Sequence, residues 1–77
     1  MRKVVITGAS GFIGKSLCKR LLEEGFYVYA VVRNKLKMKD LIEHYSLKVI
    51  EIELKDYVNL WKYIDDSIDY FFHLSWD

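Results

Sequence analysis

Short runs of β-branched residues alternate along this chain with longer stretches in which apolar residues recur every three or four positions. The alternation predicts elements in the order strand, helix, strand, helix, strand, helix, strand. The predicted strands span residues 3–7, 27–33, 47–54 and 68–74, and the predicted helices span residues 11–24, 37–45 and 57–66. Because strands that alternate with helices are joined by right-handed crossovers, the chain should form a parallel sheet.

The expected fold class is α/β, a doubly wound parallel sheet with strand order 3-2-1-4, in which the fourth strand lies on the far side of the first. Helices 11–24 and 37–45 would cover one face and helix 57–66 the other, so the fourth strand should end the sheet as an open edge. The helical spacing directs the following side chains inward: Ile13, Leu17, Cys18, Leu21 and Leu22, then Met38, Leu41, Ile42 and Tyr45, then Val58, Leu60, Trp61 and Ile64. Asp56 is the expected N-cap of the third helix.

The loop between the first predicted strand and the first predicted helix carries the strongest chemical signal, Thr7-Gly8-Ala9-Ser10-Gly11-Phe12-Ile13-Gly14. Gly8 permits a tight turn, Gly11 lets the backbone approach a pyrophosphate, and Gly14 lets helix and strand pack closely. The helix that follows offers unpaired N–H groups and a partial positive charge to phosphates. A position between strand and helix favours a dinucleotide site over a merely structural glycine turn.

The composition excludes several classes of protein. At 52% hydrophobic and 30% charged residues the chain should fold, and 77 residues allow at most one small domain. A net charge of +1 gives no overall attraction to nucleic acid or to an acidic membrane surface, so neither partner is expected. The single cysteine, Cys18, cannot form an internal disulfide, the start does not match a signal peptide, and no stretch approaches the roughly 18 apolar residues of a membrane span. We expect a cytoplasmic protein.

Three segments together resemble one protein family. They are Thr-Gly-x-x-Gly-Phe-Ile-Gly at residues 7–14, Glu53-Leu54-Lys55-Asp56 after the third strand, and Phe72-His73-Leu74-Ser75 at the end of the fourth. Similar motifs occur at these positions in the extended short-chain dehydrogenases/reductases, the sugar-nucleotide epimerases and dehydratases. The resemblance covers essentially the whole chain. It implies a Rossmann-like fold, a dinucleotide cofactor and, in the full-length protein, a nucleotide-sugar substrate.

The resemblance also implies the cofactor contacts. Gly8, Gly11, Phe12 and Ile13 would line the pyrophosphate, with Ser10 and Gly14 of the same loop also assigned to the cofactor, while Glu53 and Leu54 would lie beside the adenine and Leu74 and Ser75 under the nicotinamide ribose. Two residues depart from the family pattern. Glu53 is one methylene longer than the family's aspartate and is either an adenine contact or a solvated charge. Trp76 replaces a small alanine and either narrows the cofactor channel or caps the sheet.

The end of the second predicted strand decides between NAD and NADP. An acidic residue there would accept hydrogen bonds from a ribose 2′-hydroxyl, whereas an arginine would pair with a 2′-phosphate. The sequence has Arg33-Asn34-Lys35 at this point and no acid before Asp40. This favours NADP over NAD, with Arg33 as the cofactor-binding residue and a solvated charge as its alternative. Lys37 and Lys39 fit ordinary solvated surface.

The sequence assigns no residue to catalysis and none to a metal. The family's Tyr-x-x-x-Lys pair does not occur in it, His44 has no partner at metal-ligand spacing, and His73 and Cys18 fit structural positions. Residues 1–77 are therefore predicted to be the N-terminal part of an NAD(P)-binding domain, truncated before the substrate-binding region. Two functions stay open: the NAD(P)-binding part of an oxidoreductase, epimerase or dehydratase, or a non-enzymatic dinucleotide-binding remnant or regulatory module. The sequence leaves the oligomeric state open.

Overall fold

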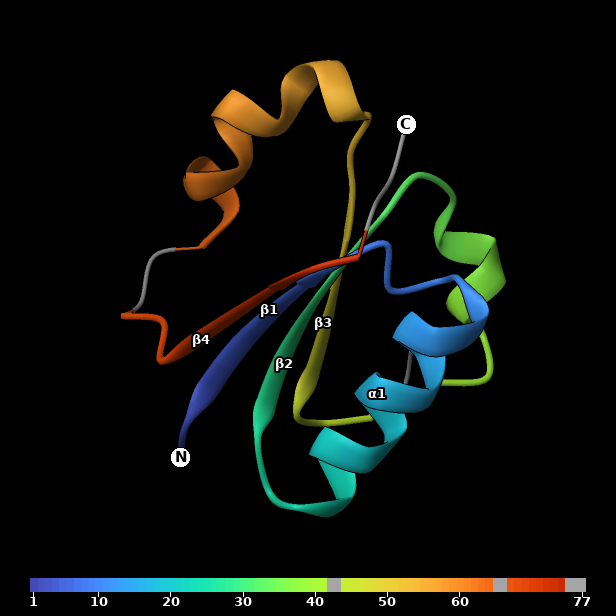
Figure 1. Cartoon of the computed structure of the whole chain (residues 1–77), viewed down its shortest axis with the longest axis vertical. Coiled ribbons are helices and arrows are strands. Elements are labelled where there is room, and N and C mark those ends of the chain that lie inside the picture. Colours follow the sequence, from blue (N-terminus) through green and yellow to red (C-terminus); the bar gives the residue numbers. More distant parts are fainter. Residues whose placement is uncertain (42–43, 65–66, 75–77) are drawn as a thin grey trace.

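A four-stranded parallel sheet forms the centre of the molecule (Figure 1). Its strands are β1 (Lys3–Thr7), β2 (Tyr27–Val32), β3 (Leu47–Glu51) and β4 (Tyr70–His73). They lie in the order β3-β2-β1-β4, so the predicted fold class and strand order are confirmed. The structure is a computed structural model that describes residues 1–41, 44–64 and 67–74, apart from the side chain of Leu54.

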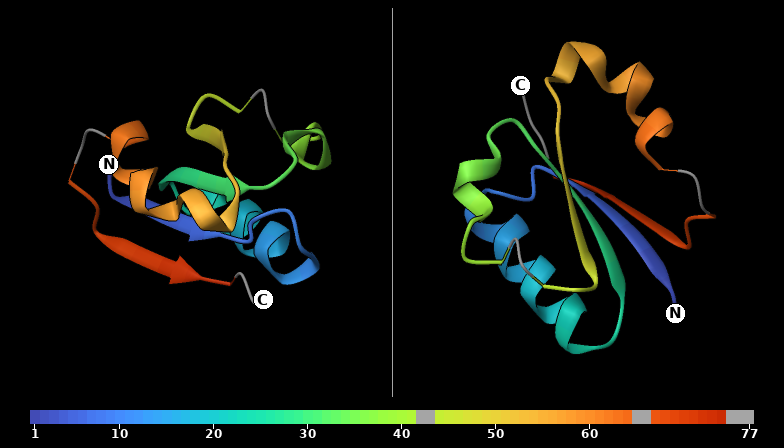
Figure 2. Two further views of the ribbon diagram at one scale, coloured as in Figure 1. Left: turned by 90° about the horizontal axis from the view of Figure 1, so that it is seen from above. Right: turned by 180° about the vertical axis from the view of Figure 1, so that it is seen from behind.

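Strands β1 and β2 are buried on both faces because their alternate side chains enter two separate cores. One core joins the sheet to helix α1 (Phe12–Glu23) and the 3-10 turn η1 (Lys35–Met38), and the other joins it to the 3-10 helix η2 (Leu54–Tyr63). The first core contains Val4, Ile6, Val28, Ala30, Val32, Cys18, Leu22 and Met38, and the second contains Val5, Tyr29, Val31, Ile50, Ile52, Leu60 and Ile64. Figure 2 shows α1 and η1 on one side of the sheet and η2 on the other. The segments predicted to cover the two faces therefore do cover them.

The two later helices differ from the prediction. In place of a helix over 37–45, η1 is one short turn, whose N-cap Asn34 accepts the Leu36 N–H at 3.0 Å. In place of an α-helix over 57–66 capped by Asp56, η2 begins after Glu53 and contains Asp56 within its first turn, and none of the described side chains caps it. A 3-10 helix repeats every three residues rather than every 3.6, and its inward positions shift accordingly.

Several side chains predicted to point inward are exposed for this reason or because they lie beyond the sheet. Within η2, Tyr57 and Leu60 pack on the sheet, whereas Val58 is 85% exposed and Trp61 is 55% exposed. Two more exposed side chains belong to Ile13, in the first turn of α1 past the end of the strands, and to Tyr45, in a non-helical turn before β3. Ile42 lies outside the described residues.

Strand β4 is the open edge that the sequence predicts. It pairs with β1 on one side, and its Tyr70, Phe71 and Phe72 are 44%, 45% and 39% exposed. The Tyr70 ring packs edge-on against Phe26 and the Phe71 ring packs at a tilt against Trp61, both at centroid distances of 5.9 Å. Among the residues that the structure describes, no helix is both long and apolar enough to cross a membrane.

Candidate functional site

The carboxyl ends of all four parallel strands lie at the same edge of the sheet (Figure 1). The chain passes from β1 through β2 to β3 on one side of β1 and then returns to place β4 on its other side. The strand order therefore reverses between β1 and β4. In open α/β sheets, ligands bind outside the carboxyl ends of the strands at such a reversal.

A glycine loop leaves β1 at this reversal and is held by backbone hydrogen bonds. Gly8 has a φ of 71°, a conformation that favours glycine, so the prediction of a tight turn is confirmed. The N–H groups of Gly8 and Ala9 both donate to the carbonyl of Val31 in β2, at 3.1 and 3.3 Å. The Gly11 N–H then donates to the Gly8 carbonyl at 3.2 Å. The loop is thus fixed against β2 before α1 begins.

Gly14 and Gly11 serve different purposes in this loop. A Cβ on Gly14 would overlap the Gly8 carbonyl oxygen and lie 2.9 Å from the Ala9 Cα, which confirms that Gly14 is needed for close packing of helix and loop. A Cβ on Gly11 would meet only the Gly8 oxygen, at an ordinary 3.5 Å. The absent side chain at Gly11 therefore relieves no clash and leaves the outer surface of the loop open.

The first turn of α1 presents donors toward this open surface. Its N-cap is Gly11, and within the described structure no side chain caps the turn and no acidic residue lies in it. The N–H groups of a first helical turn have no intrahelical acceptor and carry the positive end of the helix dipole. A recess of about 270 Å³ lies beside the loop and is lined by Gly8, Gly11, Phe12, Ile13, Gly14 and Leu74. A second, larger recess of about 410 Å³ lies elsewhere on the same edge of the sheet.

Thr7 fastens the end of β4 to the smaller recess. Its buried side-chain oxygen accepts the Leu74 N–H at 3.2 Å and lies 2.7 Å from Nδ1 of His73. The hydroxyl either donates to Nδ1 or accepts from it, according to the histidine tautomer. His73 is a hydrogen-bonded residue of the strand end, and Thr7 holds Leu74 against the glycine loop.

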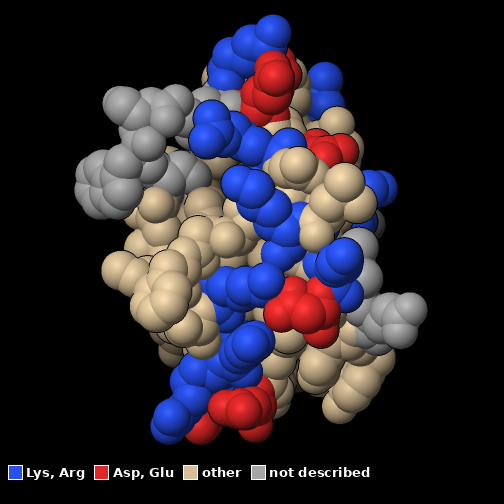
Figure 3. Space-filling model, turned by 90° about the vertical axis from the view of Figure 1, so that its right-hand side faces the viewer, with Lys and Arg blue, Asp and Glu red and all other residues tan. Residues whose placement is uncertain are grey.

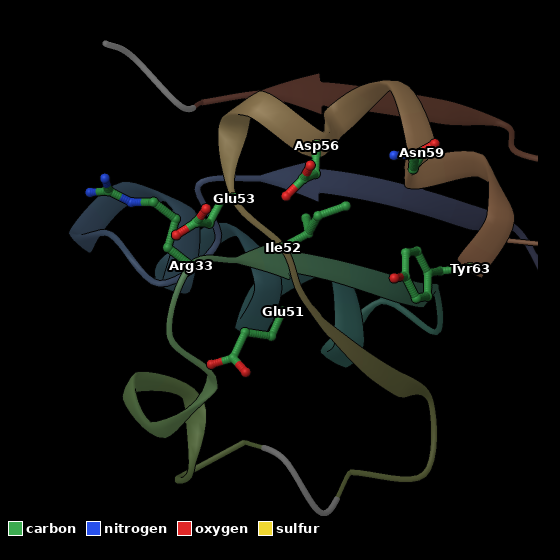
Figure 4. A pocket seen from close by; sticks show the side chains of 7 residues that line it. All are labelled: Arg33, Glu51, Ile52, Glu53, Asp56, Asn59 and Tyr63. Atoms are coloured by element: carbon green, nitrogen blue, oxygen red, sulfur yellow. The ribbon is translucent and has the colours of Figure 1, made fainter.

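The larger recess lies where β2 and β3 end, next to η2 (Figure 4). Arg33, the first residue after β2, is exposed and stands with Glu53 at one end of the view in Figure 4, while Asn59 and Tyr63 of η2 stand at the other. Its lining residues are Arg33, Glu51, Ile52, Glu53, Asp56, Asn59 and Tyr63. The recess therefore combines a cation with several carboxylates.

Three acidic side chains that follow Arg33 in the sequence have partners. Asp40 forms an ion pair with Lys15 at 2.8 Å, and the hydrogen bond from Lys15 holds the pKa of that carboxyl below its ordinary value. Glu51 accepts the backbone N–H of Lys35 at 3.0 Å, and Glu53 pairs with Lys55 at 3.5 Å. Arg33 is thus the exposed cation that directly follows β2, and it shares its recess with the carboxylate of Asp56.

The face formed by α1 and η1 is rich in positive charge. Figure 3 shows Lys and Arg side chains running along this side of the molecule, with fewer Asp and Glu among them. Residues 1–41, which include α1 and η1, hold nine of the twelve Lys and Arg but three of the eleven Asp and Glu. A surface with this imbalance attracts anions at a rate that falls as salt is added.

The structure gathers most of the predicted site residues into these two recesses. Five residues of the glycine loop and Leu74 line the smaller one, and Arg33 and Glu53 line the larger one. Ser10 lies in the same loop but lines neither recess, Leu54 begins η2, and Ser75 and Trp76 lie outside the described residues.

Sequence reasoning missed the residues of the larger recess that come from β3 and η2. Glu51, Ile52, Asn59 and Tyr63 belong to it only because β3 ends beside β2 and η2 passes over that edge. The alternation of apolar and charged residues in 47–54 placed Glu51 inside a strand predicted to end at residue 54, whereas β3 ends at Glu51 itself, so the sequence carried no signal for its place in the recess.

The other candidate side chains serve structural purposes. His44 stacks on Tyr45 at a centroid distance of 5.0 Å and accepts the Ser46 N–H at 3.1 Å. Burial raises the pKa of the Cys18 thiol to about 12, so it stays protonated at neutral pH. Within residues 1–41, 44–64 and 67–74, no His, Cys, Asp and Glu side chains form a group that could hold a metal ion.

Two curated proteins with similar sequences are named as reductases. Over 59 residues the chain is 46% identical to dihydroflavonol 4-reductase from Callistephus chinensis, and over 68 residues it is 34% identical to the NADPH-dependent 3-dehydrocapnine reductase of Ornithobacterium rhinotracheale. These alignments include 77% and 86% of this chain but 15% and 24% of the two reductases. The chain thus spans about a quarter or less of the length of these relatives.

Solved structures share the fold. A 4-hydroxyisoleucine dehydrogenase complexed with NADH superposes with a TM-score of 0.75 at 30% identity, over 84% of this chain and 28% of that one. The UDP-Glc/GlcNAc 4-epimerase of Campylobacter jejuni superposes with a TM-score of 0.83 at 20% identity, over 100% of this chain and 25% of that one. A sequence model of one family matches residues 4–76, nearly the whole chain. The chain belongs to the NAD dependent epimerase/dehydratase family.

Proposed function

We propose that residues 1–77 form the N-terminal, cofactor-binding part of an NADP-dependent reductase. The observation that carries this proposal is Arg33, which directly follows β2, is exposed, and is the cation closest in sequence to that strand end. The nearest acid after it in the sequence, Asp40, is held by Lys15. A guanidinium at this place suits a ribose 2′-phosphate, whereas a free carboxylate would suit a 2′-hydroxyl.

The two recesses would bind different parts of the cofactor. The pyrophosphate would lie against Gly8, Gly11, Phe12 and Ile13, where the first-turn N–H groups of α1 point outward. The adenosine end would extend to the larger recess, with its 2′-phosphate at Arg33 and its adenine beside Glu53 and Leu54. The nicotinamide ribose would pass over Leu74 and Ser75. When bound, the cofactor supplies the hydride, and these residues hold and orient it.

A reductase is favoured by the relatives that match most of this chain. Dihydroflavonol 4-reductase and the NADPH-dependent 3-dehydrocapnine reductase are both named for reduction, and the second is named for NADPH. The sequence of residues 1–77 has no Tyr-x-x-x-Lys pair to supply the proton in such a step. We therefore place the catalytic acid outside this segment and limit its own task to binding the cofactor.

The second candidate is a nucleotide-sugar epimerase or dehydratase, which is favoured by the description of the family that matches residues 4–76. The two candidates share the cofactor site and differ in substrate. A panel of ketones and a panel of nucleotide sugars, each tested for cofactor-dependent turnover by the protein at its natural length, separates them. Saturable cofactor binding with turnover of neither panel would favour a non-enzymatic dinucleotide-binding module.

The cofactor proposal is tested by calorimetric titration with NADPH and NADH. Arg33→Asp should weaken NADPH binding about 10- to 100-fold, the loss expected when charge-assisted hydrogen bonds are removed, and should leave NADH binding close to wild type. Lys19→Asp is the matched control, because it makes the same charge change at an exposed position of α1. Equal effects of the two variants, or no saturable binding of either cofactor by the wild type, would overturn the proposal.

A further inference from the structure

Glu51 joins the end of β3 to the segment that carries Arg33. It is the last residue of β3 and lies opposite Val32, the last residue of β2, in the parallel ladder. Its Oε2 accepts the backbone N–H of Lys35 at 3.0 Å. Only Arg33 and Asn34 separate Val32 from Lys35. The segment with Arg33 is therefore fixed at both ends, by the ladder at Val32 and by Glu51 at Lys35.

The strand directs the Glu51 side chain to the correct face for this contact. Leu47 and Val49, at alternate positions before it, pack in the core that contains Met38 of η1, whereas Ile50 and Ile52 pack in the opposite core. Glu51 continues the first series, so its side chain lies on the η1 face of the sheet. Figure 4 shows it pointing away from η2 and toward the segment that contains η1.

The rest of η1 is anchored farther from Arg33. Met38 is fully buried, and the carbonyl of Lys37 accepts from the Lys15 ammonium at 2.8 Å. Asn34 caps the turn locally through the Leu36 N–H and makes no link to the sheet by that bond. Glu51 thus ties the beginning of η1, next to Arg33, to the sheet.

We propose that Glu51 is a positioning residue for cofactor discrimination, which holds the segment 33–35 so that Arg33 faces the 2′-phosphate. This inference rests on the proposed function. A loop that is already ordered loses less conformational entropy when a ligand binds, so a fixed segment binds the phosphate more tightly. NADH lacks the phosphate and gains nothing from Arg33. Glu51 therefore acts on the ratio of the two affinities.

Two substitutions separate the hydrogen bond from the charge. Glu51→Gln keeps a side-chain oxygen that accepts the Lys35 N–H, and Glu51→Ala removes the acceptor. We expect Glu51→Ala to lower the ratio of NADPH to NADH affinity about three- to tenfold, where tenfold corresponds to about 1.4 kcal/mol. Glu51→Gln should keep the ratio within about twofold of wild type, because most of the effect comes from the bond. Both are measured by calorimetric titration of the protein at its natural length.

Three further measurements make the outcome specific. Glu23→Ala is the control for loss of one exposed negative charge, because Glu23 is the last residue of α1, at the end away from the glycine loop. It should leave the ratio of NADPH to NADH affinity unchanged. Amide hydrogen exchange at Lys35 should accelerate in Glu51→Ala and not in Glu51→Gln, which tests the contact without any cofactor. In the background of Arg33→Ala, Glu51→Ala should no longer change the ratio, because the two residues act as one unit.

Different results overturn different statements. An unchanged ratio in Glu51→Ala, or an NADPH affinity that rises in both Glu51 variants, would overturn the positioning role; the second result would show that the carboxylate repels the phosphate. A persistent effect of Glu51→Ala in the Arg33→Ala background would also overturn it. If the wild type binds neither cofactor, or prefers NADH, the proposed function fails instead, while the Lys35 exchange rates still report the contact.

Discussion

Gly11 and Gly14 lie in one loop, three residues apart, and the structure needs them for different reasons. A side chain at Gly14 meets backbone atoms of Gly8 and Ala9 that have no room to move, since both residues bond to the Val31 carbonyl. A Cβ at Gly11 makes only an ordinary van der Waals contact, with the Gly8 carbonyl oxygen, and is otherwise unobstructed. The same motif therefore contains one glycine for packing and one for access to the loop.

Substitution by alanine should separate these two requirements. Gly14→Ala should lower the free energy of unfolding by about 1–3 kcal/mol, because the helix and the loop must move apart. Gly11→Ala should lower it by less than about 1 kcal/mol, the usual effect of a poor N-cap, yet weaken dinucleotide binding. Urea unfolding and calorimetric titration of both variants provide the measurements. A larger loss of stability at Gly11 than at Gly14 would contradict this assignment.

At the scale of elements, the strands follow from the sequence and the short helices do not. A continuous run such as residues 27–32 is buried on both faces in any doubly wound sheet, so its pattern predicts both the strand and its central place. Segments 37–45 and 57–66 have helical spacing, but a 3-10 turn can also bury the apolar side chains of each segment. The single turn of η1 is enough to bury Met38, and the three-residue repeat of η2 brings Leu60 onto the sheet, where it is buried.

The same difference explains how much of the candidate site was predictable. The glycine loop is contiguous in sequence, so its glycines and their places beside β1 could be predicted, and the end of β2 pointed to Arg33. The contact between Glu51 and Lys35 depends on the pairing of Val32 with Glu51. No local pattern in the sequence specifies which residue of β2 lies opposite which residue of β3.

Helix α1 contains a titratable group that reports its packing. Burial against the sheet raises the pKa of Cys18 from 9.0 to about 12. The folded state therefore keeps a proton that the unfolded chain releases between these values, and the free energy of unfolding should fall by about 1.4 kcal/mol per pH unit in that interval. Below pH 9 this contribution to stability is fully present. The pH dependence should be measured by urea unfolding from pH 8 to 11.

Cys18→Ala is the control for the titration of lysines and tyrosines in the same interval. The difference between wild type and variant should shrink as pH rises from about 9, because only the wild type holds the thiol proton in the folded state. Alkylation of Cys18 at neutral pH should likewise require unfolding or detachment of α1. Parallel stability curves for the two proteins, or rapid alkylation of the folded chain, would show that the thiol is not held as described.

At the scale of the whole molecule, both charge and coverage are unevenly distributed. Positive side chains gather on the side with α1 and η1 (Figure 3), while the opposite end of the sheet presents the aromatic side chains of β4. The strand contains no charged residue and no proline, the devices that usually discourage pairing at an edge. An edge of this kind tends to pair with another strand.

The 77-residue chain should therefore associate with itself as its concentration rises, and a charge on β4 should oppose this. Phe72→Lys places an ammonium on the edge strand. Val58→Lys is the matched control, because it also replaces an apolar side chain with lysine, but on η2, at a position that is 85% exposed. Light scattering after gel filtration, over about a hundredfold range of concentration, should show a mass that rises for the wild type and for Val58→Lys and stays monomeric for Phe72→Lys. Because a single lysine at the edge removes only edge pairing, equal association of both variants would show that some other surface joins the chains.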